Sequence, residues 1–124
     1  MAVGILLVTH PGIGSALLET ATRLLGRLPL EARAFDVEFD ADLAVQLPRA
    51  SAALKKVMGE DGALVLTDVY GASPAGLAQQ LTQIASPCRR VAGLSLPMLL
   101  RVMNYGEQDL DELARTAANG ARNG

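Results

Sequence analysis

The sequence is poor in several residue types on which common protein sites depend. Its 124 residues include no tryptophan, two phenylalanines, two tyrosines, one cysteine and one histidine. One cysteine forms no internal disulfide, and one cysteine with one histidine supplies no set of soft ligands for zinc. Stacking of nucleic-acid bases on aromatic rings is equally poorly supported. We therefore expect no disulfide framework, no structural metal and no nucleic-acid partner.

Charge and long apolar runs are also limited. The net charge is -2 and charged residues make up 19% of the chain, unlike a basic nucleic-acid surface or a disordered acidic tail. The apolar run at 2–9 is too short to span a bilayer and lacks the basic flank of a signal peptide. We expect one cytoplasmic domain over residues 1–124, with the lone Cys88 in reduced form.

Apolar residues make up half of the chain and recur in four short runs between segments of helical pattern. The four runs are residues 2–9, 31–37, 62–69 and 89–96. Strands that alternate with helices predict a parallel sheet. The first and third runs are almost wholly apolar, which favours central strands, and the second and fourth should flank them.

The helical segments separate these runs and follow the last one. They are predicted at residues 15–28, 40–60, 73–85, 96–105 and 109–121. Ser15 and Ser73 are the expected N-caps, with Pro74 in the first helical position. Pro48 should kink or divide the second segment. The result is a small doubly wound α/β domain with a mainly parallel four-stranded sheet, whose ligand crevice lies beyond the carboxyl ends of the strands.

Two residues with catalytic chemistry fall at that edge of the predicted sheet. His10 follows the first run and Asp68 follows the third. On neighbouring strands the carboxylate can accept a hydrogen bond from one ring nitrogen and leave the other facing the crevice, as a nucleophilic imidazole requires. Pro11 favours an extended backbone at His10. The plainer interpretation is that the histidine is structural and that Asp68 caps a turn.

Small and hydroxylated residues surround this pair. Glycines allow a tight turn with exposed N–H groups, the following helix directs its positive end there, and hydroxyls add donors for an anion. The predicted phosphoryl-binding residues are Thr9, Gly12, Gly14, Ser15, Gly71 and Ser73. A small domain that binds an anion without transfer chemistry fits the same pattern.

Other known motifs fit less well. A dinucleotide fingerprint needs glycine where Leu17 stands. A nucleophile elbow around Ser73 meets Ala75 in place of its last glycine, and the only histidine precedes the serine instead of following it. The chain also lacks the phosphate-binding sequence of P-loop enzymes.

Three ordered segments give the chain a family resemblance that runs from residue 1 to about residue 122. "GILLVTH", "LVLTDVYGASP" and "VAGLSLPMLL" resemble motifs of the IIA domain of the mannose family of the bacterial phosphoenolpyruvate:sugar phosphotransferase system. The resemblance implies that His10 accepts a phosphoryl group from the carrier protein HPr and passes it to a IIB component. It implies that Asp68 hydrogen-bonds the imidazole. A membrane permease is then an indirect partner, and no cofactor is needed.

Some positions depart from the family pattern. Pro11 replaces the usual glycine, Tyr70 a frequent tryptophan and Ala72 a second glycine, and Leu94 with Ser95 replace valine and asparagine. The nucleophile and its orienting acid are retained. The sequence leaves two roles open, namely phosphoryl transfer for sugar uptake and a regulatory domain that acts through protein contacts.

The resemblance also implies a homodimer. The chain ends near the point where some family members begin an exchanged strand, so we expect dimerisation without it. Met98, Leu99 and Val102 are the predicted contacts. The alternative is that these three apolar residues pack inward.

Overall fold

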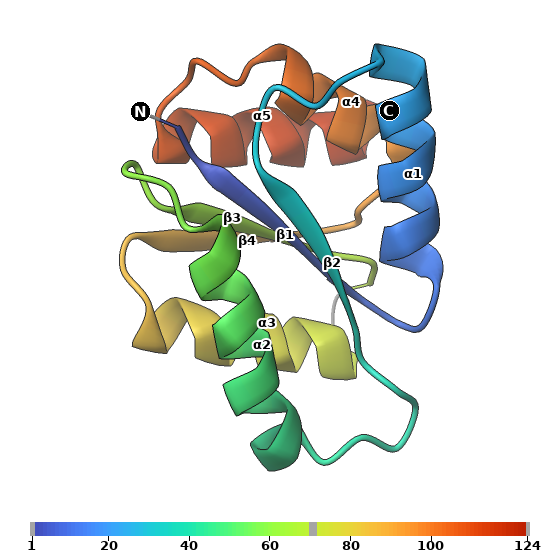
Figure 1. Ribbon diagram of the computed structural model, residues 1–124, viewed down its shortest axis with the longest axis vertical. Coiled ribbons are helices and arrows are strands. Elements are labelled where there is room, and N and C mark those ends of the chain that lie inside the picture. The colour runs from blue at the N-terminus through green and yellow to red at the C-terminus, as the bar shows by residue number, and fades with distance from the viewer. Residues whose placement is uncertain (1, 70–71, 124) are drawn as a thin grey trace.

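The computed structural model describes residues 2–69 and 72–123, which form one parallel sheet with helices on both faces (Figure 1). The strands are β1 (Gly4–Thr9), β2 (Ala32–Asp36), β3 (Ala63–Thr67) and β4 (Cys88–Ala92). The helices are α1 (Ile13–Leu25), α2 (Leu43–Val57), α3 (Ser73–Ile84), α4 (Leu96–Asn104) and α5 (Leu110–Asn123). The predicted α/β class is confirmed.

The strand order is β2-β1-β3-β4, and all neighbouring strands are parallel. The two apolar runs therefore form the central strands, as predicted, because every residue of β1 and β3 is buried. Val8 of β1 lies in register between Phe35 of β2 and Thr67 of β3. The carboxyl ends of these strands consequently meet at one edge.

The helices form two layers, with α1, α4 and α5 on one face of the sheet and α2 and α3 on the other (Figure 1). Side chains of β1 alternate between the two cores. Ile5 and Leu7 pack in the first layer, whereas Leu6 and Val8 pack in the second. Burial of each such leucine stabilises the folded state by about 1.5–3 kcal/mol, so the packing on both faces of the sheet contributes strongly to stability.

One helix begins before its predicted range, and both serines expected as N-caps lie inside their helices. The N-cap of α1 is Gly12, with φ 85°, and Ser15 lies inside the helix. The N-cap of α3 is Ala72, and Ser73 is the first helical residue. The two predicted serine caps are therefore wrong, since glycine supplies the left-handed turn at α1 and the extended residue before α3 has no capping side chain.

The predicted division at Pro48 is also wrong, because α2 runs without a break from Leu43 to Val57. Proline removes one N–H, which leaves the carbonyl of Ala44 without its helical donor. Both residues are exposed, so water can satisfy that carbonyl.

The end of the sheet also differs from expectation. β4 ends at Ala92, before the predicted limit of 96, because Gly93 turns the chain with φ 86°. Met98, Leu99 and Val102 are 0% exposed within the protomer. They fill the core of the α1, α4 and α5 layer, so their prediction as dimer contacts is wrong and the inward-packing alternative holds.

Candidate functional site at the carboxyl edge of the sheet

His10 follows directly after β1 at the carboxyl edge. Leu6 and Val8 face α2 and α3, and the alternation of a strand continues that direction to His10. Its side chain is 21% exposed. The imidazole is thus held by the fold and still accessible to a reactant.

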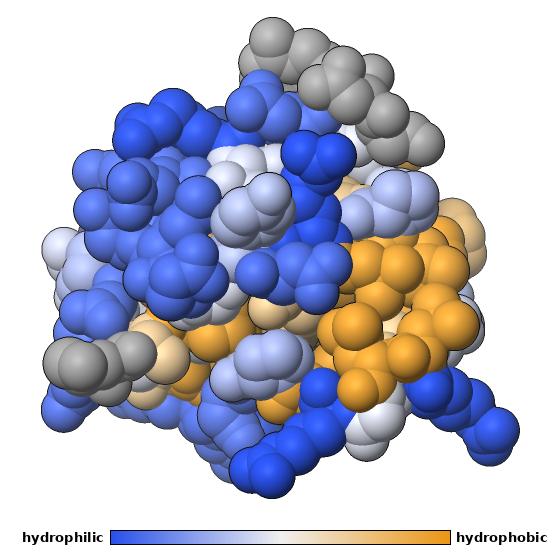
Figure 2. Space-filling model, turned by 90° about the horizontal axis from the view of Figure 1, so that it is seen from above, coloured by the Kyte–Doolittle hydropathy of each residue, from blue (hydrophilic) through white to orange (hydrophobic). Residues whose placement is uncertain are grey.

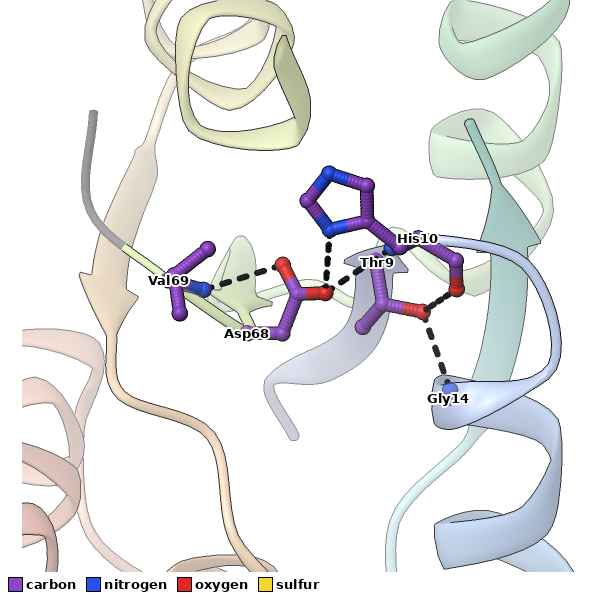
Figure 3. A network of polar contacts seen from close by, with 5 residues as sticks. All are labelled: Thr9, His10, Gly14, Asp68 and Val69. Carbon is purple, nitrogen blue, oxygen red and sulfur yellow. Dashed lines mark hydrogen bonds and ion pairs between the residues drawn. The ribbon is translucent and has the colours of Figure 1, made fainter. Parts of the chain in front are cut away.

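Asp68, just after β3, binds His10 at two points (Figure 3). Its Oδ2 accepts a hydrogen bond from the backbone N–H of His10 at 2.9 Å and lies 2.7 Å from Nδ1 of the ring. Its Oδ1 accepts from the backbone N–H of Val69 at 2.9 Å. Because an ionised carboxylate only accepts, Nδ1 carries a proton, and in the neutral imidazole Nε2 is the nitrogen with a free lone pair, which points away from Asp68.

The carboxylate is nearly buried, with 8% of its side chain exposed. Burial raises the pKa of Asp68, but the hydrogen bonds from the backbone and ring of His10 and from the backbone of Val69 lower it by more, so the net pKa lies below the ordinary value. Asp68 is therefore ionised at neutral pH and can stabilise positive charge on the imidazole.

Thr9 and Gly14, two predicted phosphoryl-binding residues, bond to the His10 loop itself. The Thr9 hydroxyl is 0% exposed, donates to the carbonyl of His10 at 2.8 Å and accepts from the N–H of Gly14 at 2.9 Å. A Cβ at Gly14 would lie 3.2 Å from both Thr9 Oγ1 and Leu7 Cβ. These groups shape the loop and are not directed at open space.

The other predicted donors fall on two sides of the ring. Gly12 and Ser15 are exposed and belong to the start of α1. Figure 3 shows Gly14, in the first turn of that helix, on the opposite side of the imidazole from Nε2, which points toward the side where α3 lies. Ser73 is the exposed first residue of α3. Gly71 lies outside the described residues, as does Tyr70.

Phe39 is a residue of this site that the sequence pattern did not predict. Its ring stacks on the imidazole of His10, with centroids 5.1 Å apart and planes 28° apart. The register that pairs Thr9 with Asp36 brings the loop after β2 beside His10. A single aromatic residue in the polar segment "DVEFDAD" was the available signal.

The described part of the chain has three further features that bear on other kinds of site. Within residues 2–69 and 72–123, no cluster of histidine, cysteine, aspartate and glutamate could hold a metal ion. Burial raises the pKa of the Cys88 thiol to about 11, although nearby Arg89 acts to lower it. Across those residues no helix has the length and apolar content to cross a membrane.

Known proteins share this sequence pattern and this fold. Residues 4–118 match the family described as the PTS system fructose IIA component, of the EIIA-man type. The mannose-specific EIIAB component of the phosphotransferase system of Escherichia coli K12 is 28% identical over 126 residues, which cover 100% of this chain and 39% of the relative.

Two solved structures share the fold. The mannose/sorbose-specific IIA subunit from Enterococcus faecalis has a TM-score of 0.86 at 23% identity, with 99% of this chain and 92% of that chain covered. The phosphotransferase component EIIA from Streptococcus agalactiae has a TM-score of 0.81 at 18% identity, with 98% and 93% covered.

The curated relatives are longer, and this chain spans 39% of the E. coli protein's length. The family match nevertheless extends over most of the chain and includes both His10 and Asp68. The chain therefore belongs to the mannose-type family of IIA components of the phosphoenolpyruvate:sugar phosphotransferase system.

Proposed function

We propose that residues 1–124 act as one phosphotransferase domain that carries a phosphoryl group on Nε2 of His10. The donor is the phosphohistidine of HPr and the acceptor is a IIB component. One observation carries this proposal: Asp68 holds the ring by Nδ1 at 2.7 Å, so Nε2 is directed away from the carboxylate and is the nucleophilic nitrogen of the neutral imidazole. An imidazole oriented in this way is a nucleophile.

In the first step the lone pair of Nε2 attacks the phosphorus atom in line with the donor's P–N bond. The new P–N bond forms as the old one breaks, and the bonding electron pair stays on the donor imidazole. The His10 ring keeps its proton on Nδ1 and becomes positively charged, and the ionised Asp68 stabilises that charge.

In the second step a nucleophile of the IIB component attacks the phosphorus, and the His10 imidazole leaves as the neutral ring. Because the imidazole of a phosphohistidine is a good leaving group, neither step calls for a cofactor.

The start of α3 is the best candidate for binding the phosphoryl oxygens. It lies on the side toward which Nε2 points, and its N-cap, Ala72, has no side-chain acceptor to occupy the helix N–H groups. We therefore assign phosphoryl binding to Ser73 and Gly71, with the positive end of the helix. Thr9 and Gly14 position the loop instead, since their polar groups already bond within it.

Membership of the IIA component family favours phosphoryl transfer for sugar uptake over the regulatory alternative. In this role the chain works in the cytoplasm, where HPr and a IIB component meet it, and a membrane permease uses the phosphoryl group further along the sequence of transfers.

A homodimer belongs to the same proposal. Leu24 of α1 is 61% exposed, and Figure 2 shows apolar side chains gathered on the side of the molecule that α1 occupies. Partly buried leucines of α1 and α4 also lie over the core on this side: Leu17, Leu18, Leu25, Leu96 and Leu100. An apolar surface of this kind fits a second copy of the chain.

The test is labelling with phosphoenolpyruvate, enzyme I and HPr, followed by intact mass spectrometry. We expect one acid-labile phosphoryl group, its loss in His10→Ala, and a phosphorus coupling to Nε2 in the NMR spectrum of the single histidine. Labelling that persists in His10→Ala contradicts the proposal. Transfer onward to a IIB component, followed with radioactive phosphate, tests the second step.

A further inference from the structure

An exposed aromatic residue covers the ring that carries the proposed chemistry. The Phe39 ring stacks on the His10 imidazole with centroids 5.1 Å apart and an interplanar angle of 28°. Phe39 itself is 73% exposed, and the apolar clusters of the described residues do not include it. Burial in the core therefore does not explain the position of this ring.

The backbone holds Phe39 at the corner of a defined turn. The N–H of Ala41 donates to the carbonyl of Glu38 at 3.2 Å, which places Phe39 and Asp40 in the two central positions. Asp40 adopts φ 62°, a left-handed conformation that costs energy for a residue with a side chain. Strain of this kind persists where the surrounding structure imposes it, often beside a functional site.

Both ends of this turn are tied to the secondary structure. The N–H of Val37 donates to the carbonyl of Thr9 at 2.8 Å, next to His10 in the chain. Asp42 caps α2, because its side chain accepts from the N–H of Ala44 at 3.0 Å. The loop therefore presents Phe39 to His10 from a fixed base.

We propose that Phe39 is a positioning residue for His10, a role that rests on the proposed phosphoryl transfer. Asp68 fixes one edge of the imidazole, and Phe39 packs on one face, so the two together restrict rotation of the ring and hold Nε2 in its outward direction. The face of an aromatic ring attracts a positive charge, and the imidazole becomes positive when it is phosphorylated. Phe39 also shields that face of the phosphorylated ring from water.

The test is single-turnover transfer from phosphorylated HPr, measured by rapid quench over a range of carrier concentrations. We expect Phe39→Ala and Phe39→Leu to lower the maximal rate by about three- to ten-fold. This is the change in rate that corresponds to the loss of one aromatic stacking interaction. The concentration for half-maximal rate should stay unchanged. Phe39→Tyr should restore the rate, because the ring is kept.

Ile84→Ala is the matched control, since Ile84 is a 56% exposed apolar residue at the far end of α3 and should leave the rate unchanged. A change confined to the half-maximal concentration overturns the proposal and makes Phe39 a contact for the carrier. Equal maximal rates in all variants also overturn it.

A second measurement separates this inference from the proposed function. His10 is phosphorylated chemically with phosphoramidate, and the hydrolysis of the product is followed without any partner protein. We expect the phosphorylated Phe39→Ala chain to hydrolyse about three to ten times faster than the wild-type chain or Phe39→Tyr. This is again about the effect of losing one aromatic stacking interaction. Phosphorylation by phosphoramidate but not by HPr refutes the proposed donor, whereas equal lifetimes refute the role of Phe39. A His10 that neither donor phosphorylates overturns both.

Discussion

Two N–H groups of His10 converge on one oxygen atom of Asp68. Oδ2 lies 2.9 Å from the backbone nitrogen of His10 and 2.7 Å from its Nδ1. One carboxylate therefore fixes both the position of the backbone at the end of β1 and the orientation of the ring. The hydrogen bonding of Asp68 and its charge can be tested separately, because an asparagine amide still accepts a hydrogen bond but carries no charge.

Asp68→Asn should slow phosphoryl transfer to His10 by something on the order of 10², the usual contribution of a positioned acid-base partner. The cationic imidazole of the transfer step loses its counter-charge, while the size of the side chain is unchanged. Rapid-quench kinetics with phosphorylated HPr measure the rate, and circular dichroism checks the fold. Transfer at the wild-type rate means that Asp68 only caps its turn.

The same substitution should make stability less dependent on pH. Hydrogen bonds hold the pKa of Asp68 below its ordinary value of 3.8, so ionised Asp68 stabilises the folded state. That contribution is complete above the ordinary pKa and is lost as pH falls through the native pKa. Urea unfolding should show Asp68→Asn less stable than the wild type at about pH 7, with the difference shrinking toward about pH 3. A constant difference contradicts the depressed pKa.

Thr9→Val should destabilise the fold by about 1–3 kcal/mol, because it leaves the N–H of Gly14 without its buried acceptor. It should also slow phosphoryl transfer, since the loop that carries His10 loses the bond to its carbonyl. Thr9→Ser is the control, as it keeps the hydroxyl and loses one methyl group, about 0.8 kcal/mol of burial. If Thr9→Val folds and transfers like Thr9→Ser, the hydroxyl does not position the loop.

Cys88 should not react with thiol reagents in the folded protein. The residue is 4% exposed and burial raises the pKa of the thiol to about 11, so very little nucleophilic thiolate exists at about pH 8. Ellman's reagent should detect one thiol only after unfolding in urea. Rapid stoichiometric reaction of the native chain contradicts this burial.

The arrangement of strands was predictable because burial leaves a strong mark on composition. The two runs that form β1 and β3 are almost wholly apolar, as strands covered on both faces must be. Helix starts were less predictable, since the N–H of Gly14 donates to the hydroxyl of Thr9 at the end of β1, and this bond replaces the cap expected from Ser15. The helix propensity of the residues around Ser15 gives no information about a contact with a side chain of β1.

The residues of the candidate site also differ in how well the sequence predicts them. His10 and Asp68 were identified because both follow buried strands, and neighbouring strands bring them together. Phe39 was missed because its contact depends on a turn in a polar loop, where Asp40 adopts an unusual backbone conformation. The alternation along β1 was an unused signal, as it assigns Thr9 and His10 to opposite faces of the sheet.

We predict that the chain dimerises through the exposed apolar surface of α1. Leu24 is 61% exposed on α1, whereas Met98, Leu99 and Val102 are buried within the protomer, so only the former can meet a second copy without unfolding. Light scattering at micromolar concentration should show a dimer for the wild-type chain and a folded monomer for Leu24→Lys, because the substitution places a charge in an apolar contact. Ile84 is 56% exposed on α3, on the other face of the sheet, and the Ile84→Lys variant should remain dimeric. A wild-type monomer at every concentration refutes the dimer, and a dimer that survives Leu24→Lys moves its interface away from α1.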